Sequence, residues 1–332
     1  MFIYRLNSRS LQINKLSMKL LIITTLCILK VNLVFFAQTL NFNSQKNWSL
    51  HKKEVIFGVG ATAFLGDLGG TNDIGKDYSP KDIDIRSTSY NLTLGFRYRF
   101  RPMFATTSSL NFGQYRASDY LTDNSGRGPR EIDIKSTLIT FYQRFEFIFF
   151  SEEKVGKRLR LPDLKGMKDK NKQAYIFGGV GLAYYSPQGG PRTKYEGVFL
   201  RPLRTEGQGL PGGAEPYKST TLIIPAGFGY RFGISKMWRM MIEATYFKTF
   251  TDYMDDVSTV YYNHELNGQT ASPETVYFSN PSENWNLFRN GDKRGEKEKD
   301  AFFYFNVCFA KNVTYKNYLR KNYQWQGVRA KF

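Results

Sequence analysis

The stretch that decides the fold reads IIPAGFGYRFGISKMWRMMIEATYFKTFTDYMDDVS and runs from Ile223 to Ser258. Before the Ile234–Lys236 turn, apolar and aromatic residues recur at every second position, and the positions between them are mixed. The same alternation resumes at Trp238. A period of two with one apolar face is the pattern of a β-strand, so the stretch predicts two antiparallel strands joined by a very short turn.

The composition of the whole chain is that of an all-β protein. It contains 22 tyrosines, 28 phenylalanines and 29 glycines in 332 residues. Aromatic, glycine-rich and alternating sequences are typical of transmembrane β-barrels. The formal net charge of +18 would suit nucleic acid, but no nucleic-acid motif accompanies it, so we expect no such partner.

The N-terminus predicts an export signal. Residues 1–37 join a basic segment to an apolar run, and the small residue Ala37 precedes Gln38. This order is that of a secretory signal peptide, with Met1 or Met18 as its start. Residues 38–53 are then a polar lead-in, residues 54–311 the barrel and residues 312–332 a basic tail. Since no later segment is apolar enough to cross a membrane as a helix, we expect an integral protein of the cell outer membrane.

Eight segments of the mature chain carry the alternating pattern and are predicted as strands. They are Glu54–Gly66, Asp84–Phe100, Met103–Ser118, Ile132–Phe150, Gln173–Ser186, Ser219–Gly233, Met237–Tyr253 and Asp300–Lys311. In an up-and-down order, the four long connections all fall at one end and both minimal turns fall at the other. Outer-membrane barrels have this asymmetry, with long outer loops and short periplasmic turns. The sequence therefore predicts an eight-stranded antiparallel transmembrane β-barrel.

Charged residues of these strands lie on the face opposite the apolar one. In the second strand, for example, Arg97 and Arg99 alternate with Phe96 and Tyr98. An arginine that faced lipid at mid-bilayer would cost about 2–4 kcal/mol, so the apolar face is predicted to point outward. The lumen would then hold an ion-pair network that fills it, with a selective pore as the alternative. Its members would be Arg97, Arg144, Glu146, Arg231, Arg239 and Glu243.

The sequence offers little catalytic chemistry. It holds two histidines, and no nucleophile motif, phosphate loop or dinucleotide fingerprint is present. We therefore expect no enzyme and no cofactor. The glycine-rich GVGATAFLGDLGG (58–70) does not lead into a helix, so its glycines are predicted to relieve crowding in a narrow barrel.

Two groups of aspartates are predicted near the outer rim. They are Asp67, Asp73 and Asp77 after the first strand, and Asp252, Asp255 and Asp256 after the seventh. Unpaired carboxylates repel one another, so these residues should pair with basic groups, cap turns or hold Ca²⁺. Turn capping is the interpretation we favour, and the spacing matches no known calcium loop.

The basic excess lies on the predicted periplasmic side. Ser151–Lys172 carries eight basic residues against four acidic ones, and the tail 312–332 adds further Lys and Arg interleaved with aromatics. Such a surface suits anionic lipid headgroups or a periplasmic protein partner. The hypothesis of a partner-binding surface rests on Arg158, Arg160, Lys165, Lys316, Arg320, Lys321 and Trp325.

Three stretches resemble a known family. FLGDLGG (64–70), LRTEGQGLPGG (203–213) and the segment from Ile224 to Tyr261, above all FTDYMDDVS, are similar to PorG, the outer-membrane β-barrel component of the type IX secretion system. The resemblance implies an OmpW-like barrel with a role in protein transport, whose periplasmic side binds the PorK–PorN ring. Outer-membrane lipid and periplasmic ring proteins are the partners expected on this basis. The alternatives are a small passive channel for apolar or small solutes, and an enzyme or receptor that uses the long loops.

Overall fold

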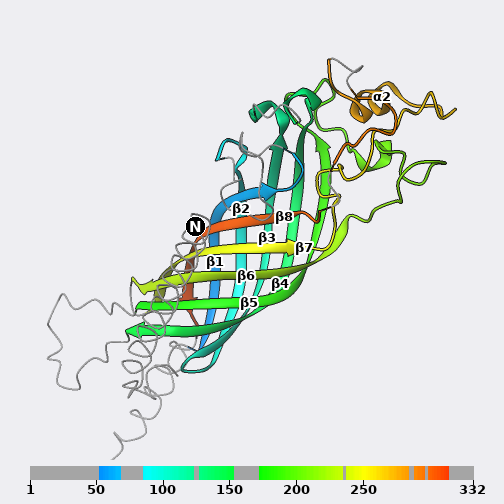
Figure 1. Cartoon of the computed structure of the whole chain (residues 1–332). Helices are drawn as coiled ribbons and strands as arrows, with labels where there is room; N and C mark the ends of the chain where they lie inside the picture. The colour runs from blue at the N-terminus through cyan, green and yellow to red at the C-terminus, as the bar shows by residue number, and fades with distance from the viewer. Residues whose placement is uncertain are drawn as a thin grey trace, which may run out of the picture.

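Eight antiparallel strands close into one barrel in sequence order, β1 through β8, with β8 paired to β1 (Figure 1). The computed structural model describes residues 52–68, 85–122, 127–152, 172–234, 237–283, 288–295 and 298–313. The strands are β1 Lys53–Leu65, β2 Ser89–Arg101, β3 Phe104–Ser118, β4 Asp133–Glu152, β5 Lys172–Gly189, β6 Thr220–Gly233, β7 Trp238–Thr249 and β8 Ala301–Asn312. The predicted fold class is confirmed, and each strand begins and ends within a few residues of its prediction.

The connections sort to the two ends of the barrel as the sequence predicted. Residues 102–103 join β2 to β3, and residues 234–237 join β6 to β7, both at what we call the turn end. Residues 190–219 and 250–300 connect strands at the opposite end, the loop end, where the one α-helix of the described chain, α2 (Pro273–Ser279), lies (Figure 1). Ser272 caps this helix by accepting a hydrogen bond from the Thr275 amide at 3.2 Å.

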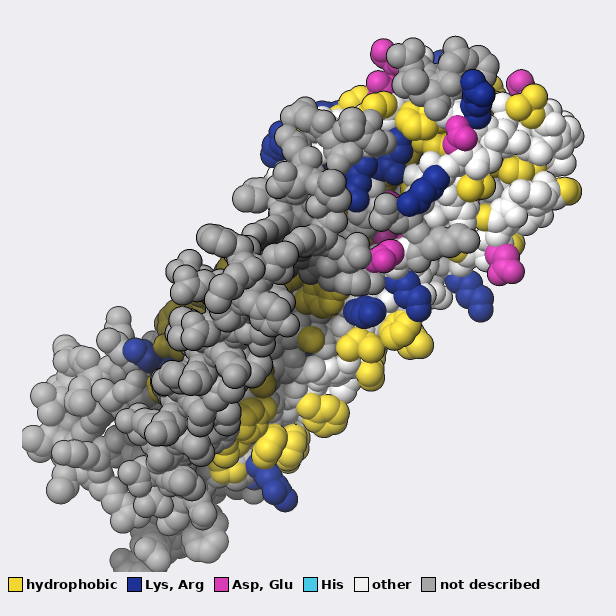
Figure 2. All heavy atoms as spheres, in the orientation of Figure 1, with side chains coloured by type: hydrophobic (Ala, Val, Ile, Leu, Met, Phe, Trp, Pro, Cys, Tyr) yellow, Lys and Arg dark blue, Asp and Glu magenta, His cyan; other side chains and the backbone are white. Residues whose placement is uncertain are grey.

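The outer wall of the barrel is apolar. Side chains that point outward along the strands are strongly exposed, reaching 65 % for Phe145 and 66 % for Val180. Figure 2 shows hydrophobic side chains along the visible wall and charged ones gathered toward the loop end. A contiguous apolar surface of this extent is characteristic of contact with lipid. The protein is therefore an integral membrane barrel of the outer-membrane type.

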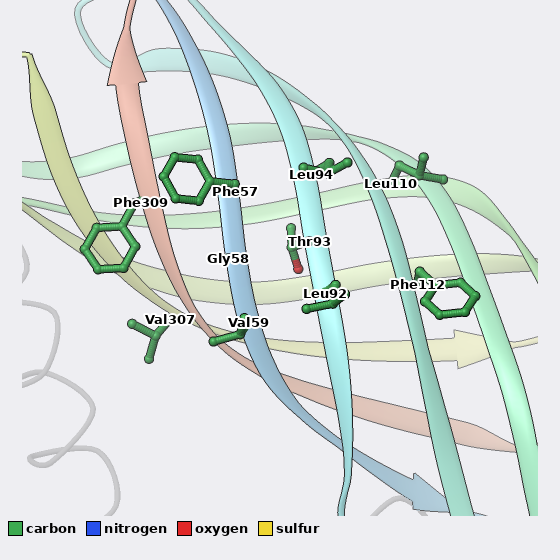
Figure 3. A pocket seen from close by; sticks show the side chains of 10 residues that line it. All are labelled: Phe57, Gly58, Val59, Leu92, Thr93, Leu94, Leu110, Phe112, Val307 and Phe309. Carbon is green, nitrogen blue, oxygen red and sulfur yellow. The ribbon is translucent and has the colours of Figure 1, made fainter.

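One shallow groove marks this outer wall. It encloses about 500 Å³ between β8, β1, β2 and β3, and Figure 3 shows that its rim is aliphatic and aromatic, with Phe57, Val59 and Leu94 among its residues. Because it lies on the apolar wall, the groove is part of the surface that faces lipid. In the part of the chain that the structure describes, no helix is long and apolar enough to cross a membrane.

The interior of the barrel is packed. Aromatic rings fill its middle, where Phe247 stacks on Phe302 with ring centroids 4.5 Å apart and Tyr142 meets Phe247 edge-on. Space is tight, because a Cβ built on Gly60 would lie 1.9 Å from the Asn306 side chain. This confirms the interpretation that glycines of the first strand relieve crowding. Apolar residues of the loops continue the same core, so the loop end packs on the barrel.

Candidate functional site

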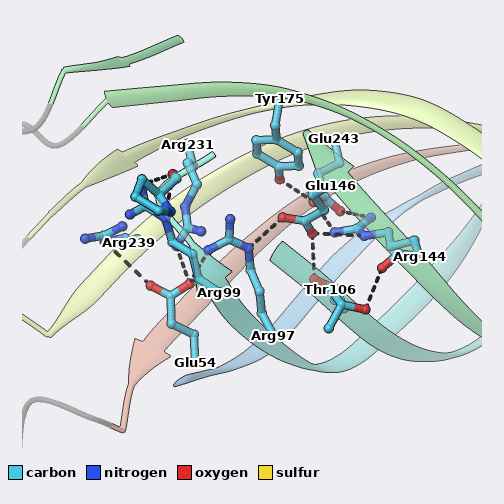
Figure 4. A network of polar contacts seen from close by, with 12 residues as sticks. Glu54, Arg97, Arg99, Thr106, Arg144, Glu146, Tyr175, Arg231, Arg239 and Glu243 are labelled. Carbon is cyan, nitrogen blue, oxygen red and sulfur yellow. Dashed lines mark hydrogen bonds and ion pairs between the residues drawn. The ribbon is translucent and has the colours of Figure 1, made fainter. Parts of the chain in front are cut away.

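The turn end of the lumen holds a network of buried charges centred on Glu54 (Figure 4). Glu54 and Arg97 are direct partners in the β1–β2 register, and Arg97 Nη1 donates to Glu54 Oε2 at 3.2 Å. Arg231 Nη2 reaches the same oxygen at 2.5 Å from β6. Arg239 Nε, near the start of β7, lies 3.7 Å from Glu54 Oε1. Three guanidinium groups therefore surround one carboxylate.

A second group of charges continues from Arg97 across the lumen. Arg97 Nε donates to Glu146 Oε2 at 2.6 Å, and Arg144 Nε lies 3.2 Å from Glu146 Oε1. Arg144 also donates to both oxygens of Glu243, at 3.0 and 2.5 Å, in a bidentate pair. The Tyr175 hydroxyl donates to the same Glu243 carboxylate. All of these side chains are buried, so the network ties β1, β2, β4, β5, β6 and β7 together inside the barrel.

The structure places all six sequence-named lumen residues inside this network. Sequence reasoning missed Glu54, its centre, and Tyr175. The alternation of β1 could have identified Glu54, because Glu54 and Ile56 are two positions apart and therefore point to the same, inward side of the strand. The seven residues of the partner-binding hypothesis, from Arg158 to Trp325, lie outside the described residues, as do the predicted signal peptide and nearly all of the predicted lead-in and tail.

A second buried network, at the loop end, is centred on Glu206. Its carboxylate accepts hydrogen bonds from the Ser258 amide at 2.9 Å, the Thr259 amide at 3.1 Å and the Thr259 hydroxyl at 2.7 Å. The Tyr253 hydroxyl donates to it at 3.3 Å, and Arg294 Nη1 lies 3.5 Å away. Glu206 thereby fastens the β5–β6 loop to the β7–β8 loop.

Asp256 reinforces the same junction. It adopts a left-handed backbone conformation, with φ at 61°. Its carboxylate accepts hydrogen bonds from the Thr205 hydroxyl at 2.6 Å and the Tyr217 hydroxyl at 2.5 Å. Arg294 Nη1 donates to Thr205 Oγ1 at 2.9 Å. The DYMDDVS and LRTEGQG sequences are therefore the two halves of one buried contact.

Arg130 joins the remaining loops to this junction. It forms a buried ion pair with Asp119, with Nε 3.0 Å from Oδ2. Its Nη1 and Nη2 donate to the backbone carbonyls of Arg294 and Asp67, each at 2.7 Å. The loop end is therefore a cross-linked cap, made of the connections β1–β2, β3–β4, β5–β6 and β7–β8.

Carboxylates crowd together where the cap meets the barrel. Burial raises the pKa of Asp252 to about 8. Burial, followed by the charges of neighbouring aspartates, raises the pKa of Asp255 and of Asp300 well above the usual range. Burial also raises the pKa of Asp256 to about 6, against the opposing charge of Arg294. The protonation equilibria of these groups are therefore shifted toward the protonated form, and least so for Asp256.

The aspartates of the predicted outer rim act as hydrogen-bond acceptors. Asp255 Oδ1 accepts from the Val257 amide at 3.1 Å, as turn capping predicts. Asp252 Oδ2 accepts instead from a side chain, the Ser258 hydroxyl, at 2.6 Å. Asp255 and Asp256 are buried rather than displayed at the rim. Within the described residues, no group of three or more His, Cys, Asp or Glu is arranged to hold a metal ion. Asp73 and Asp77 lie outside those residues.

Comparison with known proteins yields solved structures alone, since no protein-family model and no curated protein matches the chain. Neisserial surface protein A aligns with 79 % of this chain and 97 % of its own, at 6 % identity and a TM-score of 0.35. The attachment invasion locus protein Ail of Yersinia pestis covers the same shares, at 11 % identity and a TM-score of 0.31. OprG, an outer membrane protein of Pseudomonas aeruginosa, aligns with 79 % of this chain and 96 % of its own, at 9 % and 0.30. Such low scores carry no argument, so the barrel assignment rests on the strand pairing and the apolar wall.

Proposed function

We propose that this protein is an anchoring component of a type IX secretion apparatus. The barrel would hold it in the outer membrane, and its periplasmic face would bind the PorK–PorN ring. One observation supports the proposal. Parts of the three stretches that resemble PorG, 64–70, 203–213 and 224–261, come together at the loop-end cap. Glu206 and Asp256 join the second stretch to the third, and Arg130 links the Asp67 carbonyl of the first to the same cap. The stretches that resemble PorG thus contribute to one structural unit, the loop-end cap, and are not scattered over the barrel.

A structural role also suits the filled lumen. Its turn end is occupied by paired charges and its middle by stacked aromatic rings. Water and solutes need a continuous polar path, whereas this interior alternates an ion-pair layer with an apolar layer. A rigid cylinder of this kind is suited to holding a partner in place. The cap and the proposed ring-binding face lie at opposite ends, so the cap would stiffen the barrel without touching the ring.

Charge reversal on the periplasmic face tests the proposal. Arg158, Arg160, Arg320 and Lys321 would be replaced together by Glu, and the ring proteins that co-purify with the barrel in mild detergent would be quantified. We expect the ring to be lost, because the change inverts an electrostatically complementary surface. The barrel itself should still insert and still run as a folded, heat-modifiable band on gels. Unchanged co-purification would reject docking through this surface.

A matched control reverses charge at the other end. Arg192 and Lys194 are exposed on the loop side, so Arg192→Glu with Lys194→Glu should leave ring binding intact. The channel alternative has its own test, since it predicts flux of small solutes through the barrel in liposomes. We expect no flux above that of empty vesicles. Flux that persists when the ring is absent would favour the channel over the anchor.

A further inference from the structure

A pocket opens within the β7–β8 loop, at the end of the molecule farthest from the turn end. It encloses about 960 Å³ between residues 261–266, the second half of α2 with the residues after it, 276–282, and residues 288–290. Figure 1 shows α2 there, beyond the ends of the strands. Pockets that take small ligands have volumes of about 300–1,000 Å³. No member of the Glu54 or Glu206 networks lines the pocket, so it is separate from both of them.

The walls of this pocket are held together by the loop itself. The Gly291 amide donates to the Tyr261 carbonyl at 2.8 Å, and the Tyr261 ring stacks on Phe288 with centroids 5.0 Å apart. The Asn280 side chain donates to the Phe288 carbonyl at 3.3 Å. These contacts join the third wall to both of the others, so the pocket is formed before a ligand arrives. A preformed site binds its ligand without the cost of ordering a loop.

Part of the pocket wall is apolar and uncovered. Leu266 is 75 % exposed, more than any other large hydrophobic side chain of the described residues, although it belongs to a loop and not to the lipid-facing wall. Val276, on α2, is 46 % exposed and lines the same pocket. Exposed apolar side chains that line one pocket mark a place where a ligand with an apolar face gains free energy by covering them.

The polar side chains of the lining offer both donors and acceptors to a ligand. Asn263 Oδ1 accepts the Leu266 amide at 3.0 Å, and Asn290 Oδ1 accepts the Asn263 amide at 2.9 Å. The amide nitrogens of these two asparagines make no hydrogen bond to the described residues, and neither does the Arg289 guanidinium group. The Glu265 carboxylate, likewise without a partner there, is an acceptor on the same lining.

Charge and shape together define the class of ligand. Of Lys, Arg, Asp and Glu side chains, the described lining holds one of each sign, Arg289 and Glu265, so the site is neutral overall. An anion would be repelled by Glu265 and a cation by Arg289. A neutral saccharide avoids both penalties, and each of its hydroxyl groups both donates and accepts hydrogen bonds. The C–H groups of its ring form an apolar face that suits Leu266 and Val276.

We propose that this pocket binds a neutral saccharide. Asn263, Asn290 and Arg289 donate to its oxygen atoms. Glu265 accepts from its hydroxyl groups, and Leu266 packs against its ring. The long loops of outer-membrane barrels face outward, so the site takes saccharides from outside the cell. It lies at the opposite end of the barrel from the proposed ring-binding surface and shares no residue with it, so the two proposals stand or fall separately.

Saturation-transfer NMR on the full chain tests the proposal. The protein is held in micelles of lauryldimethylamine oxide, because this detergent has no sugar headgroup that could compete. The panel of ligands is glucose, galactose, fucose, N-acetylglucosamine, cellobiose and diacetylchitobiose. At least one of them should bind saturably with a Kd below about 10 mM, and its ring C–H protons should receive the strongest transfer. The proposal is overturned if no member of the panel binds in this range.

Asn290→Asp locates the site while keeping the loop intact. The variant retains Oδ1, which accepts the Asn263 amide, and replaces only the amide nitrogen. Binding of the saccharide that binds best should therefore weaken by about tenfold. Gln269→Glu is the matched control, because it makes the same amide-to-carboxylate change in the same loop but outside the lining, and it should retain the wild-type Kd. Equal weakening by both variants would mean that added negative charge alone controls binding, and would overturn the assignment.

Leu266→Ala separates a saccharide from an apolar ligand. Because Leu266 is exposed, its truncation should leave the fold unchanged, and it should weaken saccharide binding by about threefold, less than Asn290→Asp does. N-acetyl-leucine amide, a neutral peptide-like compound, should not compete with the saccharide. Competition by this compound, or a larger loss from Leu266→Ala than from Asn290→Asp, would indicate a site for apolar peptide segments and would overturn the saccharide assignment.

Discussion

The two ends of this barrel bury charge in opposite proportions. At the turn end, three guanidinium groups share Glu54. At the loop end, Asp252, Asp255 and Asp300 crowd together, and their pKa values are raised by burial and then by neighbouring carboxylates. Carboxylates can take up protons and so avoid buried charge, whereas arginines cannot. Protonation can therefore neutralise the loop end, whereas the arginines of the turn end stay charged and depend on their carboxylate partners.

The largest effect is expected from removing the single carboxylate that three arginines share. Glu54→Gln keeps the size of the side chain but removes the carboxylate that Arg231 and Arg97 share, and Arg97 then keeps Glu146 as its acidic partner. Breaking a buried ion pair in this way costs about 3–5 kcal/mol. Urea unfolding in lipid vesicles, followed by the heat-modifiable gel shift, measures the loss.

The control for this substitution is a solvent-exposed ion pair of the same protein. Glu196 lies 2.9 Å from Lys135 but is 52 % exposed. Glu196→Gln should cost about 0–1 kcal/mol, as is usual for exposed pairs. If the two substitutions lowered the free energy of unfolding by similar amounts, burial would not strengthen the ion pairs of the turn end.

A smaller and more local effect is expected at the loop end. Glu206→Gln weakens the acceptor on which the Ser258 and Thr259 amides depend, at a cost of about 1–3 kcal/mol. Amide exchange at these two residues should accelerate, while exchange in β2 and β3 should stay slow. Glu265→Gln, at an exposed position of the β7–β8 loop that contains both amides, is the control. Faster exchange throughout the barrel would mean that the cap is not a separate unit.

The barrel could be predicted from sequence because each strand carries its own evidence. The alternation of side chains placed Arg97 and Arg144 on the face opposite the apolar one. Because the apolar face contacts lipid, where an arginine is costly, both arginines had to point into the lumen. Pairing register is harder, because it depends on all eight strands closing together. The lumen charges could therefore be predicted from sequence without their centre, Glu54, which occupies the second position of its strand.

The loop-end cap could not be predicted from local patterns. Glu206 and Thr259 are separated by more than fifty residues, and no periodicity links two irregular loops. The aspartates after β7 were expected near the rim, yet Asp256 is buried against Thr205 and Tyr217. Resemblance to PorG drew attention to both stretches without indicating that they touch. Contacts of this kind emerge from tertiary packing, which composition and spacing do not encode.

The smallest expected difference between the two ends is in how their stability depends on pH. Burial raises the pKa of Asp252 to about 8 in the folded cap, above its ordinary value of 3.8. A raised pKa means that the folded state binds the proton more tightly. The resulting stability is complete below about pH 4 and is lost as pH rises through about 8. We therefore expect the cap, but not the arginine-rich turn end, to loosen across this interval.

Amide exchange at Met254 can detect this loosening, because its N–H donates to Asp300 Oδ2 at 2.8 Å. Its protection factor, corrected for the intrinsic pH dependence of exchange, should fall between about pH 4 and 8. Asp252→Asn cannot ionise, so this variant should flatten the fall, whereas Asp292→Asn, at an exposed position of the same loop, should not. Protection that rises with pH would show that these carboxylates are ionised in the folded cap. The contrast between the two ends would then lie in the sign of their charge and not in how it is neutralised.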